Sequence, residues 1–115
     1  MSFEEMMKGL QREYLSSIPE KIKVILAQIA ANDLSNLRES FHKLKGTGRT
    51  YGLPEVSELG DMVEAICLEH PVNSVAAGRI AASMLEDVFR ERTAGNVFEF
   101  SRDARVTDLQ KLLPK

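Results

Sequence analysis

The chain has 115 residues, of which 43% are hydrophobic and 28% charged, the composition of one soluble globular domain. This length buries a sizeable core but excludes a catalytic domain with a separate substrate domain. The net charge of -2 excludes broad electrostatic capture of nucleic acid or of an acidic membrane, so neither is expected as a partner. A single cysteine excludes an intramolecular disulfide and a multi-cysteine metal site. No apolar run approaches the roughly 20 residues that span a bilayer, and residues 1–15 carry too many charges for a secretory signal. We therefore expect a cytoplasmic location.

Helical periodicity begins near the N-terminus. Apolar residues recur at three- and four-residue steps, the spacing of amphipathic helices that bury one face. A break is expected at Ser17, because Pro19 suits the first turn of a new helix better than an interior position. The two stripes are Phe3, Met6, Met7, Leu10, Tyr14 and Ile18, then Ile18, Ile22, Ile25, Leu26 and Ile29. The second helix is predicted to end near Asn32, and the Met6–Met7 pair is expected to pack in the core or at the N-terminus.

Three further helices and a tail follow. Asp33 is the expected N-cap of a third helix. Gly52 and Pro54 predict its stop and the start of a fourth, which ends before His70. A fifth helix is predicted over residues 73–92, with Gly95 as its terminator. Their stripes are Leu34, Leu37, Phe41, Leu44, Gly48 and Tyr51; Val56, Leu59, Val63, Ile66 and Cys67; and Ala81, Leu85, Val88 and Phe89. Residues 97–100 have no decisive period, whereas Val106, Leu109, Leu112 and Leu113 indicate a short terminal helix.

The fold class that follows is all-α. Each stripe can be buried only against the others, which predicts an antiparallel, up-and-down four-helix bundle with an additional N-terminal helix and a short C-terminal extension. We expect the bundle domain to span residues 1–95 and assign no role to residues 96–115. Bundles host many unrelated activities, so function has to be argued from a site.

The third helix carries a cationic face around His42. At 100° per residue, His42 lies well away from the centre of the apolar stripe. Arg38, Lys45 and Arg49 are its neighbours on that face. Like charges placed so close together destabilise an isolated helix slightly, so the cluster indicates a site where an anion binds. Gly46 lies one turn beyond His42, where a glycine costs about 1 kcal/mol relative to alanine. Core packing does not explain it, but open space for an approaching molecule does.

Glu64 is the expected partner of His42. A nucleophilic histidine needs one ring nitrogen to hold and donate its proton, which leaves the lone pair of the other free. His42 and Glu64 each lie about ten residues from the turn at Gly52, so at 1.5 Å per residue they reach nearly the same height. A hydrogen bond between them is therefore reasonable and favours Nε2 as the reactive atom. Gly48 faces inward and is expected to permit close helix contact.

Two other patterns are weaker. Cys67 and His70 have the spacing of two metal ligands, but no third ligand is evident, so no metal site is expected. His70 instead suits the C-terminal dipole of its helix. The run Lys45-Gly46-Thr47 matches a fragment of a phosphate-binding loop, but it lacks the preceding glycine and strand. A nucleotide-binding enzyme is therefore not expected.

The run from His42 to Leu53 resembles the signature of histidine-containing phosphotransfer (HPt) domains of two-component phosphorelays. That pattern is a histidine, an apolar residue two positions later, Lys-Gly, small residues, and an aromatic or apolar residue followed by glycine. This chain matches it at His42, Leu44, Lys45, Gly46, Gly48, Tyr51 and Gly52. HPt domains often have Glu or Gln where Glu64 stands, whereas Thr47 and Arg49 stand where smaller or uncharged residues are common.

The resemblance implies a phosphocarrier without its own ATP site. His42 would accept a phosphoryl group on Nε2 from a receiver-domain aspartate and pass it to another receiver. Lys45 would be the main phosphate contact and Arg38 and Arg49 secondary ones, with Lys43 facing the partner or water. Expected partners are receiver domains or a hybrid histidine kinase, and the protein is expected to be a monomer without a cofactor, the magnesium ion belonging to the receiver. An alternative stays open: a phosphorylation-independent interaction module that docks a receiver or kinase by charge and shape.

Overall fold

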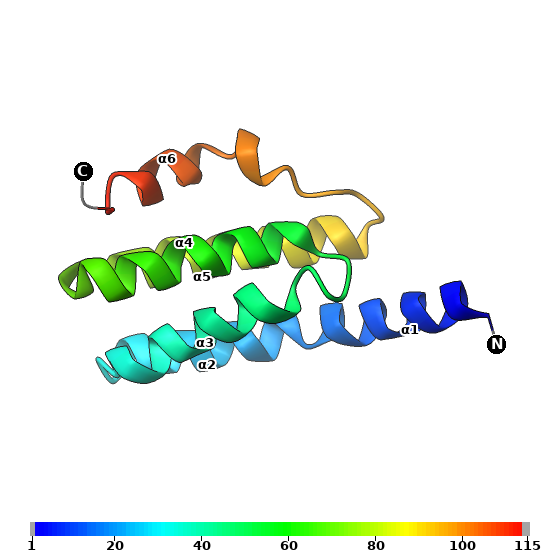
Figure 1. Cartoon of the computed structure of the whole chain (residues 1–115), viewed down its shortest axis with the longest axis horizontal. Helices are drawn as coiled ribbons and strands as arrows, with labels where there is room; N and C mark the ends of the chain where they lie inside the picture. The colour runs from blue at the N-terminus through cyan, green and yellow to red at the C-terminus, as the bar shows by residue number, and fades with distance from the viewer. Residues whose placement is uncertain (1, 114–115) are drawn as a thin grey trace.

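The computed structural model describes residues 2–113, which contain helices and no strand. The α-helices are α1 (Phe3–Ser16), α2 (Ile18–Ala30), α3 (Leu34–Thr47), α4 (Pro54–Glu69), α5 (Ser74–Thr93) and α6 (Ala104–Gln110), with short 3₁₀ helices η1 (Pro71–Asn73) and η2 (Phe100–Arg102). Helices α2 to α5 form an antiparallel bundle, and α1 continues beyond its end (Figure 1). The predicted all-α bundle with an additional N-terminal helix is confirmed.

Local signals set most helix ends. The Asp33 side chain accepts a hydrogen bond from the amide of Asn36 at 3.3 Å, as expected of an N-cap. Gly52 and Gly95, which were predicted to end the third and fifth helices, adopt φ values of 78° and 87°, the left-handed conformation that favours glycine. One detail differs: α3 ends at Thr47, so Gly48 is its C-cap rather than an interior residue.

The core is made mainly from the predicted stripes of α2 to α5, to which Leu53 before α4, Met84 of α5 and Leu109 of α6 are added. Its largest fully buried side chains are Phe41, Ile18, Ile25, Leu37, Leu44, Leu53, Leu59, Ile66, Met84, Leu85, Leu109 and Val56. The assignment of Leu26 to the stripe of α2 was wrong, because its side chain is 44% exposed. Ile25 occupies the inward position, and the next residue lies 100° further round the helix, toward solvent.

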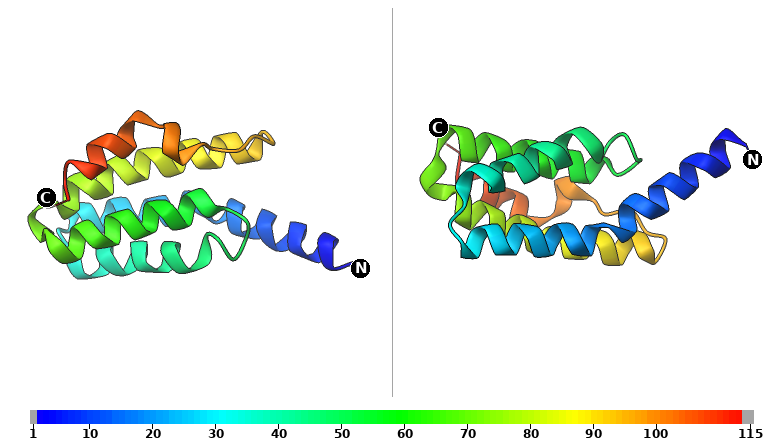
Figure 2. Two further views of the ribbon diagram at one scale, coloured as in Figure 1. Left: turned by 45° about the horizontal axis from the view of Figure 1, so that its top comes forward. Right: turned by 90° about the horizontal axis from the view of Figure 1, so that it is seen from below.

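Helix α1 leaves much of its apolar stripe uncovered. Phe3 is 72% exposed and Met6 and Leu10 are also exposed, whereas Tyr14 is buried. Of the two alternatives expected for the Met6–Met7 pair, core or N-terminal packing, the core position is therefore wrong for Met6. The first turns of α1 extend past the bundle, where no other helix of residues 2–113 covers them (Figure 2). Tyr14 fixes the other end of α1, since its ring stacks on Tyr51 with centroids 4.9 Å apart.

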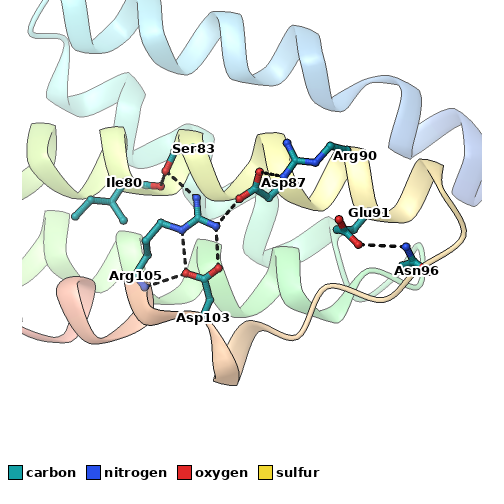
Figure 3. A network of polar contacts seen from close by, with 8 residues as sticks. All are labelled: Ile80, Ser83, Asp87, Arg90, Glu91, Asn96, Asp103 and Arg105. Atoms are coloured by element: carbon teal, nitrogen blue, oxygen red, sulfur yellow. Dashed lines mark hydrogen bonds and ion pairs between the residues drawn. The ribbon is translucent and has the colours of Figure 1, made fainter.

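The tail folds back onto the bundle. Val106 and Leu109 of α6 are buried against α4 and α5, so the predicted terminal helix is present, with Leu112 and Leu113 just beyond it. Arg105 joins the tail to α5 through Asp87 at 2.6 Å, and it also pairs with Asp103 at 2.8 Å (Figure 3). Residues 96–113 thus pack as part of the folded structure.

The ion pairs of Arg105 predict a pH-dependent contribution to stability. Burial alone would raise the pKa of Asp87, but hydrogen bonds from Arg105 and Arg90 hold that pKa below its ordinary value. The hydrogen bond from Arg105 lowers the pKa of Asp103. Groups with a depressed folded pKa stabilise the fold fully above the unfolded pKa of about 3.9, and this stability is lost as pH falls through the folded values.

Arg105→Ala is therefore expected to lower the free energy of unfolding by roughly 1–2 kcal/mol at pH 7. Urea unfolding of the wild type and the variant should show this gap at pH 7 and a much smaller gap near pH 3. Arg102→Ala is the matched control, because Arg102 is exposed and forms no ion pair in residues 2–113. An equal gap at both pH values would show that packing of the Arg105 side chain, and not its charge, holds the tail.

Candidate functional site

Two glycines let α3 and α4 approach backbone to backbone. A Cβ atom at Gly60 would lie 2.5 Å from the Lys45 nitrogen and 2.7 Å from the Phe41 oxygen. A Cβ atom at Gly48 would lie 2.6 Å from the Ser57 nitrogen, in keeping with the close contact expected there. Gly60 was not singled out from the sequence, although an interior helix glycine one turn before Glu64 is the same kind of signal. The close approach brings side chains of α4 within reach of those of α3.

His42 uses one ring nitrogen and leaves the other free. Its side chain is 59% exposed, and Nδ1 donates a hydrogen bond to Oε2 of Glu64, whose side chain is only 9% exposed. The hydrogen bond expected from the helix geometry is therefore present. In residues 2–113, no group hydrogen-bonds to Nε2. A carboxylate beside Nδ1 favours the tautomer with the proton on that atom, which leaves the lone pair on Nε2 of this largely exposed ring.

Lys45 lies beside this pair and contacts two carboxylates. Its Nζ is 3.4 Å from Oε1 of Glu64 and 3.2 Å from Oδ1 of Asp61. Hydrogen bonds to Asp61 and then Glu64 raise the pKa of Lys45, so it is fully charged at neutral pH. Asp61 was missed at the sequence level, although its position three residues before Glu64 places it on the same helix face. The cluster is thus a solvent-facing imidazole oriented by a buried carboxylate, with an ammonium group alongside.

Most of the chain matches one protein-family model. The family model of the Hpt domain matches residues 9–95, which include α2 to α5 and most of the chain. The chain belongs to the Hpt domain family. No curated protein and no solved structure matches it.

Membership of the Hpt domain family implies a general function for the chain. Hpt domains take part in phosphotransfer in two-component signalling, where they interact with receiver domains and kinases. They act as phosphocarriers and not as enzymes with an ATP site. The helical bundle has the architecture expected of this family.

The remaining predicted residues of the Hpt site are not drawn into the cluster. Arg38 is half-buried and Lys43 and Arg49 are exposed, and none of them forms an ion pair within the described part of the chain. Lys43 borders a groove of about 290 Å³ between α2 and α3. A Cβ atom at Gly46 would meet nothing within 4 Å, so the surface next to His42 is open as expected.

Two further observations concern metal-ligand groups and membrane-spanning helices. Cys67 is buried and His70 is exposed, and residues 2–113 bring together no group of three His, Cys, Asp or Glu side chains that could hold a metal ion. Among the same residues, no helix combines the length and the apolar character needed to cross a membrane.

Proposed function

We propose that the protein is a phosphocarrier whose His42 accepts a phosphoryl group on Nε2 from a receiver-domain aspartate and passes it to another receiver. The hydrogen bond between Nδ1 and Glu64 carries this proposal, because it directs the free lone pair of an exposed imidazole toward solvent. The open surface at Gly46 supports it further, since a receiver has to bring its aspartyl phosphate within bonding distance.

In the proposed step, the Nε2 lone pair of His42 attacks phosphorus while the bond from phosphorus to the receiver's carboxyl oxygen breaks. The receiver regains a carboxylate, and the proton on Nδ1 stays in place. Positive charge develops on the imidazole as the N–P bond forms, and the Glu64 carboxylate stabilises it. Passing the group to a second receiver runs the same step in reverse, through a loose and roughly in-line transition state.

The cations around His42 have graded roles in this proposal. Lys45 is the main phosphate contact because it lies in the same cluster as His42 and Glu64. Arg38 and Arg49 are secondary contacts, and Lys43 meets the partner's surface or water. The protein needs no cofactor of its own, and a magnesium ion held by the receiver neutralises charge on the transferring group.

The partners, the oligomeric state and the cellular location are also part of this proposal. Partners are receiver domains or a hybrid histidine kinase, and the protein acts as a monomer in the cytoplasm. The single thiol, Cys67, is buried and unpaired in the described structure, which suits a reducing compartment.

A transfer assay tests the proposed function. Purified protein is mixed with a labelled phospho-receiver and magnesium, and the label on the protein is tested for stability in acid and base. We expect label that is lost in acid and retained in base, as for an N–P bond. Failure to take up label from a panel of receivers, and from the small donor phosphoramidate as well, would contradict the proposal and favour a docking module.

Gly46→Arg separates receiver access from the reactivity of His42. The long side chain fills the open surface, so transfer from a phospho-receiver is expected to fall at least about tenfold. Labelling by phosphoramidate should stay near the wild-type rate because this donor is small. Helix propensity predicts no loss of melting temperature.

Gly46→Ala is the matched control, with the same gain in propensity and little added bulk. Wild-type transfer in Gly46→Arg would show that receivers do not approach across this position. An equal loss with phosphoramidate would show that the substitution disturbs His42 itself.

A further inference from the structure

Asp61 forms an ion pair with Lys45, the residue that the proposed function assigns as the main phosphate contact. Lys45 Nζ is 3.2 Å from Asp61 Oδ1, the shorter of its two carboxylate contacts. The other carboxylate belongs to Glu64, which is buried and also accepts the hydrogen bond from His42. Before any phosphoryl group arrives, the Lys45 ammonium group therefore already contacts two carboxylates.

The Glu64 and Asp61 carboxylates differ in how easily each can release its contact with Lys45. Glu64 is fixed between His42 and Lys45 in a buried position, whereas the Asp61 side chain is 65% exposed. Within residues 2–113, Lys45 is the only ion-pair partner of Asp61. Water can therefore solvate the Asp61 carboxylate when Lys45 moves to contact another anion.

The charge balance around His42 makes this exchange consequential. Among the three contacting side chains, Lys45 carries one positive charge and Asp61 and Glu64 each carry one negative charge, so the two carboxylates outweigh the one ammonium group that touches them. A phosphoryl group adds about 1.5 to 2 further negative charges near neutral pH. Its oxygens attract Lys45, while the Asp61 carboxylate both holds Lys45 and repels the incoming group.

We propose that Asp61 is a positioning residue that competes with the phosphoryl group for Lys45 and so keeps phospho-His42 in a readily transferable state. The inference rests on the proposed function and deepens it. Asp61 lowers the occupancy of phosphohistidine at equilibrium with a phospho-receiver. It thereby favours delivery of the group to the next receiver over its storage on His42.

The first test measures the transfer equilibrium in Asp61→Asn, which keeps the shape of the side chain and removes its charge. With a fixed amount of phospho-receiver, the ratio of phosphohistidine to phosphoaspartate is expected to rise two- to five-fold, the range typical of an exposed ion pair. Glu58→Gln is the matched control, because Glu58 is exposed on the same helix and forms no ion pair in the described structure. An unchanged ratio in Asp61→Asn, or an equal rise in Glu58→Gln, would overturn the inference.

A double-mutant cycle with Lys45→Met shows whether Asp61 acts through Lys45. If it does, Asp61→Asn changes the transfer ratio much less in the Lys45→Met background than in the wild type. An undiminished effect would show direct repulsion alone and would overturn the positioning role. Titration of the Lys45 side chain by NMR gives a second readout, and its pKa should fall in Asp61→Asn and stay constant in Glu58→Gln.

Failure of the proposed function and failure of the role of Asp61 are distinguishable. If neither a panel of phospho-receivers nor phosphoramidate places a phosphoryl group on His42 of the wild type, the proposed function fails and the role of Asp61 fails with it. If the wild type is phosphorylated on His42 but Asp61→Asn has the same transfer ratio, only the role of Asp61 is wrong.

Discussion

Replacing His42 by glutamine is expected to reduce phosphoryl uptake to background, a loss of at least about a hundredfold in a transfer assay. The amide of glutamine offers no nucleophilic lone pair comparable to that of Nε2. Because His42 is exposed, helicity and melting temperature should stay close to those of the wild type. Circular dichroism would therefore separate a loss of chemistry from a loss of fold.

The chain supplies its own control for this experiment, since it contains two histidines. His70 is also exposed, but it caps the end of α4 and forms no ion pair with a carboxylate in residues 2–113. His70→Gln is expected to take up label at the wild-type level. Label that persisted in His42→Gln and disappeared in His70→Gln would place the phosphoacceptor at His70, outside the cluster of His42, Glu64 and Lys45.

Gly60→Ala is expected to destabilise the protein by roughly 1–3 kcal/mol, the range for overpacking a tight contact. The added methyl group would meet backbone atoms of Lys45 and Phe41, which cannot turn aside as a flexible side chain can. The helices must separate, so Glu64 loses its close approach to His42. Urea unfolding measures the stability, and transfer by the folded fraction should be slower than in the wild type.

Gly9→Ala is the matched control for Gly60→Ala. Both glycines lie in helices, but a Cβ atom at Gly9 would meet nothing within 4 Å. Helix propensity alone predicts that alanine at Gly9 stabilises the fold by up to about 1 kcal/mol. If Gly60→Ala were as stable as Gly9→Ala, close helix contact at Gly60 would not be what holds the site together.

The fold was largely predictable because its signals are local. The N-cap at Asp33 and the helix-ending glycines Gly52 and Gly95 depend on a few neighbouring residues, and each was found where the sequence placed it. Exposure of α1 was not predictable in this way. An amphipathic stripe shows that a helix has an apolar face, but only the lengths of the neighbouring helices decide whether Met6 finds a cover.

The candidate site was predictable where it follows from counting along helices. His42 and Glu64 could be paired because both lie at the same height from one turn. The contact between Lys45 and Asp61 depends instead on how closely α3 and α4 approach and on the rotamer of a long side chain. The return of the tail depends on ion pairs of Arg105 with residues distant along the chain, which periodicity does not show.

The most direct test of the proposed chemistry is NMR of the histidine rings in uniformly ¹⁵N-labelled protein after treatment with phosphoramidate. We expect coupling between phosphorus and Nε2 of His42, with the proton retained on Nδ1 beside Glu64. A phosphoryl group on Nδ1 of His42, or on His70 with His42 unmodified, would contradict it.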